Sequence, residues 1–144
     1  MRKYNNISFI YAIAALLSGV FYREFTKILD FTGKTTLAFT HLHLFVLGTI
    51  MFLIIGILSC ITNVEEQRQF KPFMIFYNIG LPFMVTMFYV RGIIQVLGLE
   101  LSKGISSAIS GISGISHILI TIGIVMLFLA LRKSDMNFKV SKVK

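Results

Sequence analysis

The chain has 144 residues, of which 56% are hydrophobic and only 14% are charged. A water-soluble domain of this size would expose more charge, so the composition indicates an integral membrane protein. The single cysteine, Cys60, excludes an internal disulfide and a cysteine-rich metal site. The net charge of +8 is not read as a nucleic-acid surface, because the lysines and arginines lie in short connections and in the tail, where they act as a topology signal.

The first apolar segment, at about 7–24, follows Arg2 and Lys3. It has the features of either a signal peptide or a retained helix. We expect a retained membrane span, because no small-x-small cleavage site lies between Ser18 and Thr26. Small and polar residues recur in it at helical spacing and form one stripe: Ser8, Tyr11, Ala15, Ser18, Gly19 and Tyr22. We expect this stripe to face protein rather than lipid.

The second apolar segment, 36–60, holds two of the three histidines of the chain. As a helix it would be about 37 Å long, against a hydrocarbon core of about 30 Å. His41 and His43 lie five and seven residues in from Thr36, inside the membrane but near one of its faces. An unpaired polar side chain is costly there and usually has a partner. Side chains two residues apart project about 200° apart on a helix, so the two imidazoles should address two different sides of it.

The third and fourth spans are predicted at 73–99 and 107–131, after a polar loop at 63–71. Pro82 should kink the third span, and Arg91 lies near its far end, with Gln95 one turn further on the same face. The fourth span begins with a repeat of isoleucine and small residues, typical of a close-packing surface in membranes, and carries His117 near its middle.

The predicted fold class is therefore all-α, an integral membrane four-helix bundle formed by a single domain, 1–131, with a basic tail at 132–144. One side of the membrane would hold nine lysines and arginines: Arg2, Lys3, Arg68, Lys71, Arg132, Lys133, Lys139, Lys142 and Lys144. The other side would hold four: Arg23, Lys27, Lys34 and Lys103. This asymmetry predicts a multi-pass protein of the cell membrane with both termini in the cytoplasm. His41, His43 and Arg91 then lie in the outer half of the bilayer, and His117 lies nearer its centre.

Imidazole binds haem iron, copper and zinc. A closed zinc site is disfavoured, because the histidines have no neighbouring cysteine and the last three spans contain no Asp or Glu. Haem needs one or two imidazoles, apolar walls and room for its ring, and a nearby cation suits its propionates. Glycine lets a porphyrin approach a backbone, and Gly48 lies on the His41 face of its helix. The candidate haem-binding residues are His41, His43, His117, Arg91 and Gly48, and the three histidines among them are the candidate metal ligands.

The stretch from Thr40 to Gly48, THLHLFVLG, resembles the His-x-His helix in the catalytic subunit of haem-copper oxidases and nitric oxide reductases. In those proteins one histidine serves a high-spin haem and the other a low-spin haem. The resemblance implies that His41 and His43 are haem ligands. As a whole, the chain also resembles an uncharacterised family of small four-span bacterial membrane proteins.

These observations predict non-covalent binding of haem b, since the chain has no Cys-x-x-Cys-His attachment site. The role would be electron transfer or haem-based sensing of gas or redox state, with a redox partner that the sequence does not name. One alternative is a small transporter subunit or assembly factor in which the histidines and Arg91 form a structural network. A second alternative is a copper-binding membrane protein, for which several methionines are available.

A homotrimer is the predicted assembly. The oxidase subunit is built as three arcs of four helices, so three copies of this chain would resemble it. The resemblance then implies that His41 of one protomer and His43 of the next hold one haem. His117 would line that pocket, and it is the competing ligand if the haem lies within one protomer.

Overall fold

The computed structural model describes residues 1–135, so positions 136–144 of the predicted basic tail lie outside the described residues. The described chain is all-helical, as predicted, and its elements in order are α1 (Arg2–Ile28), α2 (Leu37–His43), the π-helical η1 (Leu44–Ile50), α3 (Met51–Ile61), the 3-10 helix η2 (Val64–Glu66), α4 (Phe70–Val96) and α5 (Lys103–Lys133). The segments α2, η1 and α3 continue into one another as one helix, Leu37–Ile61, which we call the α2–α3 helix.

Four helices are long and apolar enough to cross a membrane: α1, the α2–α3 helix, α4 and α5. This confirms the prediction of four spans, although the ends differ by a few residues. The third span ends at Val96 rather than at position 99, because Gly98 adopts a φ of 62° that stops the helix. The fourth begins at Lys103 rather than at 107, because the hydroxyl of Ser102 caps it by accepting from the Ile105 amide.

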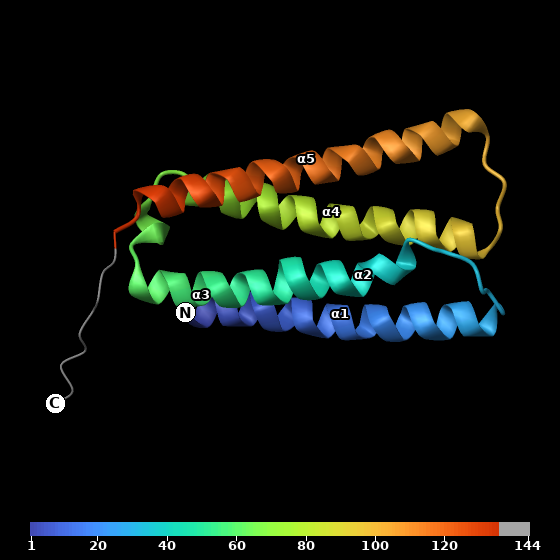
Figure 1. Ribbon diagram of the computed structural model, residues 1–144, viewed down its shortest axis with the longest axis horizontal. Coiled ribbons are helices and arrows are strands. Elements are labelled where there is room, and N and C mark those ends of the chain that lie inside the picture. Colours follow the sequence, from blue (N-terminus) through green and yellow to red (C-terminus); the bar gives the residue numbers. More distant parts are fainter. Residues whose placement is uncertain (136–144) are drawn as a thin grey trace.

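The four helices lie side by side, and each runs in the opposite direction to the one before it in the chain (Figure 1). α1 packs along the α2–α3 helix, α4 lies next to that pair, and α5 lies along α4 and against η2. The connections 29–36 and 97–102 share one end of the bundle, which we call the loop end (Figure 1). The N-terminus and the end of α5 share the opposite end, as expected for an even number of spans (Figure 1).

The core lies mainly between α1, the α2–α3 helix and α4, and its largest fully buried side chains are Tyr77, Phe52, Phe73, Leu37, Ile55, Leu81 and Met84. The predicted stripe of α1 faces this core, where Ser8, Ala15 and Ser18 are buried. Many large apolar side chains are exposed on the outside of the bundle, among them Phe9, Leu16, Leu17, Ile118 and Phe128.

Three hydrogen bonds tie the start of the α2–α3 helix to α4. The Thr36 amide donates to Gln95 Oε1 at 2.8 Å, and the Thr36 hydroxyl donates to the Phe88 carbonyl oxygen at 2.9 Å. The Thr35 hydroxyl donates to the Gly92 carbonyl oxygen at 3.0 Å. These bonds set the height of the following helical turns, which carry His41 and His43, relative to α4. α4 itself runs through Pro82 as one helix.

The π-helical stretch η1 begins directly after His43. A π-helical stretch loosens the regular backbone ladder, and such stretches are frequent at functional sites. Side chains from two neighbouring helices bond to its carbonyl oxygens. The Tyr77 hydroxyl donates to Leu47 at 2.9 Å and the Ser8 hydroxyl donates to Thr49 at 2.9 Å. These two hydrogen bonds therefore stabilise the π-helical stretch that directly follows the two histidines.

Candidate functional site

His41 and His43 lie on two different sides of the α2–α3 helix. His41 lies against α1, where a Cβ placed on Gly19 would be 3.7 Å from the His41 Cβ. His43 lies against α4, and its ring meets the Phe88 ring edge to face with 4.9 Å between centroids. Within one protomer, the two imidazoles therefore do not converge on a common ligand.

The structure brings His43 and His117 to the same aromatic side chain. The His117 ring, on α5, also meets Phe88, with 6.2 Å between centroids. We call the surface formed by His43, Phe88 and His117 the histidine face. Sequence reasoning did not pair His117 with His43, and it did not single out Phe88. The signal available for Phe88 was its position one turn before Arg91 on the same helix.

Both imidazoles of the histidine face are held through their Nδ1 atoms. His43 Nδ1 lies 2.8 Å from the Phe39 carbonyl oxygen, and His117 Nδ1 lies 3.0 Å from the Ser113 carbonyl oxygen. A carbonyl oxygen can only accept, so Nδ1 is the donor in both contacts. In a neutral imidazole this leaves the lone pair on Nε2. Metal-binding histidines are commonly oriented in this way by a hydrogen bond to a backbone carbonyl.

His41 is held differently. Its Nδ1 is buried and has no hydrogen-bond partner within residues 1–135. No acceptor therefore fixes a proton on Nδ1, and Nε2 is not set up as a metal ligand in the way that it is in His43 and His117. Of the three candidate ligands, two share one face and one orientation, and the third differs in both.

Gly48 is buried between helices instead of opening onto a space for a ring. A Cβ at this position would lie 2.5 Å from the Tyr11 ring of α1. The Tyr11 ring also stacks on Phe52 with 5.7 Å between centroids. In this structure Gly48 therefore packs the α2–α3 helix against α1.

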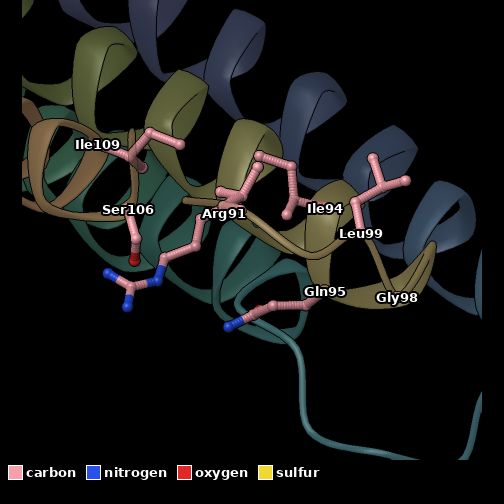
Figure 2. A pocket seen from close by; sticks show the side chains of 8 residues that line it. Arg91, Ile94, Gln95, Gly98, Leu99, Ser106 and Ile109 are labelled. Carbon is pink, nitrogen blue, oxygen red and sulfur yellow. The ribbon is translucent and has the colours of Figure 1, made fainter. Parts of the chain in front are cut away.

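Arg91 lies on α4 one turn nearer the loop end than Phe88. Its Nη1 donates to the Ser110 hydroxyl of α5 at 3.2 Å. Together with Gln95 and Ser106, Arg91 lines a cavity of about 340 Å³ between α4 and α5. Figure 2 shows the guanidinium group reaching past Ser106, with the Gln95 amide on the same side of α4. In the described part of the chain the one ion pair joins Arg23 and Glu24, so Arg91 has no carboxylate partner there.

Residues 1–135 contain no group of three or more His, Cys, Asp or Glu side chains placed to hold a metal ion. Cys60 is free and exposed. A haem iron takes only one or two ligands from the protein, so a site of that kind does not need such a group.

No curated protein and no solved structure matches the chain. These searches therefore give no support to the resemblance to haem-copper oxidases. A match to a family model does support the predicted membership of an uncharacterised family. One family model matches residues 1–134, and the chain belongs to the family that this model describes as "Protein of unknown function (DUF2871)".

Proposed function

We propose that this protein binds haem b non-covalently within the membrane and acts in electron transfer or in haem-based sensing of gas or redox state. The observation that carries the proposal is the orientation of His43 and His117. Each has its Nδ1 bonded to a backbone carbonyl, which leaves Nε2 as a nitrogen suited to iron. These two histidines are the first candidates to hold the haem iron. Bound haem supplies a one-electron iron couple.

Two neighbouring side chains support this choice of cofactor. Phe88 contributes an aromatic wall that both imidazoles contact. Arg91 lies one turn further toward the loop end and carries a positive charge with no carboxylate partner among the described residues. It is placed to pair with propionate groups, which would then point toward the membrane surface.

His41 remains a candidate ligand only if a second protomer supplies the rest of its site. It faces away from His43 and lacks the carbonyl contact that the other two histidines have. The assignment of His43 and His117 therefore takes precedence over the arrangement that the oxidase resemblance implies, with His41 and His43 from two protomers.

The same proposal includes a homotrimer in the cell membrane, with both termini in the cytoplasm. Support for an assembly comes from α5, where small and polar residues are exposed: Ser107, Ser110, Gly111, Gly114, His117 and Thr121. A Cβ on Gly111 or Gly114 would have no neighbouring atom within 4 Å. Polar side chains exposed to lipid are costly, so we expect another copy of the chain to cover this surface.

The absorption spectrum of the protein purified from haem-replete cells tests the proposal. A Soret band with sharp reduced α and β bands is expected for bis-histidine haem b. His43→Ala and His117→Ala should each remove or convert this spectrum, whereas His41→Ala, the matched control, should preserve it. A folded but colourless preparation contradicts the proposal and favours the structural network. Copper in the metal analysis of a colourless protein favours a copper site.

A further inference from the structure

A second site lies on the side of the α2–α3 helix that faces α1. It is an apolar crevice of about 370 Å³ between α1 and the α2–α3 helix. This volume lies within the range of small-molecule sites. The α1 side is formed by Ala15, Leu16 and Gly19, and the other side by His41, Leu42 and Phe45. Because Gly19 has no side chain, the floor of the crevice stays open beside the imidazole.

His41 gives this apolar crevice one polar group. Its buried Nδ1 has no partner among the described residues, so this nitrogen is unsatisfied within the chain in either tautomer. In the tautomer that carries its proton on Nε2, this second nitrogen is a hydrogen-bond donor at the crevice, which His41 lines. Inside a bilayer no bulk water can accept a hydrogen bond from Nε2. A ligand with an acceptor oxygen would therefore satisfy this donor.

We propose that this crevice binds the ring of a lipid-soluble quinone or quinol. Such a ligand has a flat ring that fits between the helices beside Phe45 and an oxygen that accepts from His41 Nε2. Its apolar tail can continue along the lipid-facing surface of α1, where Leu16, Leu17 and Val20 are exposed. A phospholipid chain would match the apolar walls equally well, but its shape makes no use of a glycine floor beside a single donor.

This inference rests on the proposed haem and names its electron partner. His41 and His43 are two residues apart, about 3 Å along the helix axis, and they face different sides of a helix about 10–12 Å wide. A ring at His41 would therefore lie within about one helix diameter of a cofactor at His43. One quinol gives up two electrons and two protons as it becomes a quinone. Two bound ferric haems would each take up one of these electrons, and the two protons would be released to the aqueous phase.

The first test needs no haem. A photoreactive azido-quinone is illuminated with the purified protein, and the labelled peptides are identified by mass spectrometry. We expect labelling at α1 and at the first turns of the α2–α3 helix, prevented by excess unlabelled quinone. Gly19→Leu should fill the crevice and reduce labelling at least fivefold. Gly104→Leu adds the same side chain where no atom lies within 4 Å, and it should leave labelling unchanged.

The second test follows reduction of the ferric haem protein by duroquinol at the α band. Gly19→Leu and His41→Leu should each slow this reduction at least tenfold, while dithionite still reduces both variants completely. Labelling at other peptides overturns the quinone site. Crevice labelling that Gly19→Leu and His41→Leu both retain at full strength overturns it too. A haem protein that duroquinol reduces equally fast in all variants overturns it as well. A colourless protein labelled in the crevice supports the quinone site and contradicts the haem proposal, so the two failures are distinguishable.

Discussion

Gly92 on α4 lies directly against Leu37, the first residue of the α2–α3 helix. A Cβ on Gly92 would lie 2.5 Å from Leu37 Cγ and 2.7 Å from the Leu37 backbone nitrogen. Real Cβ atoms do not approach other atoms this closely, and the backbone nitrogen is fixed by the helix. The absence of a side chain at Gly92 therefore determines how closely the His41 and His43 segment approaches α4.

We expect Gly92→Ala to push the start of the α2–α3 helix away from α4. The substitution should lower the free energy of unfolding by about 1–3 kcal/mol, which is typical of overpacking. It should also weaken haem retention, because His43 would move relative to Phe88. Gly104→Ala, at a position with open space around it, serves as the control. Unfolding in mild detergent and the haem content of the same preparations check this. An unchanged stability in Gly92→Ala would contradict the close approach.

A relay of hydroxyl groups connects three helices near His41. The Tyr89 hydroxyl donates to Ser18 at 2.8 Å, Ser18 donates to Thr40 at 2.7 Å, and Thr40 donates to the Leu37 carbonyl oxygen. Tyr89→Phe removes the first bond only, and Ser18→Ala removes two. Hydrogen bonds between membrane helices average about 0.6 kcal/mol, so Ser18→Ala should destabilise the protein about twice as much as Tyr89→Phe.

Thermal or denaturant unfolding in detergent measures both variants of this relay. Tyr22→Phe is a suitable control, because no hydrogen bond of the Tyr22 hydroxyl is found among the described residues. Equal effects of Ser18→Ala and Tyr22→Phe would show that the relay does not stabilise the packing of these helices.

The sequence was sufficient to predict the number of helices and the opposite orientations of His41 and His43. Both follow from local rules: the length of each apolar run, and the rotation of about 100° per residue in a helix. The contact of both His43 and His117 with Phe88 could not be predicted, because it depends on how the α2–α3 helix and α5 pack against α4. The packing of Gly48 against Tyr11 could not be predicted for a related reason. A glycine on a helix surface suits a porphyrin and a neighbouring helix equally well, and only tertiary structure shows that Tyr11 occupies the space.

The small residues of α5 provide a test of assembly. Gly111→Leu places a bulky side chain on the exposed stripe without any clash inside the protomer. If another copy covers this stripe, the variant should dissociate into monomers that remain folded. The mass of the complex in mild detergent checks this, with Gly104→Leu as the matched control. A trimer that persists in Gly111→Leu would mean that α5 does not form the interface, and a monomeric unmodified protein would contradict the trimer itself.

Membrane orientation is tested by reporter fusions. Fusions after Ser134 and within 63–71 should report a cytoplasmic location, and a fusion within 29–34 should report an external one. The reason is the excess of lysine and arginine on the side that holds both termini. The fusion within 29–34 is the internal control, since it must report the opposite side from the other two. An external C-terminus would reverse the depths assigned to the histidines and Arg91.

Substitutions of Arg91 test whether this residue pairs with the haem propionates or belongs to a structural network. Arg91→Leu removes the positive charge beside the histidine face but leaves the imidazoles in place. Haem affinity should fall about tenfold, which corresponds to about 1.4 kcal/mol, while any haem that remains keeps the same spectral type. Arg91→Lys should retain part of the affinity, because it preserves the charge but not the forked geometry. Arg23→Leu is the control, since Arg23 is exposed and paired with Glu24.

Titration of haem into the apo-protein measures all three variants. If Arg91→Leu binds haem as tightly as Arg23→Leu but unfolds more easily, Arg91 acts through its bond to Ser110 and holds α5 against α4.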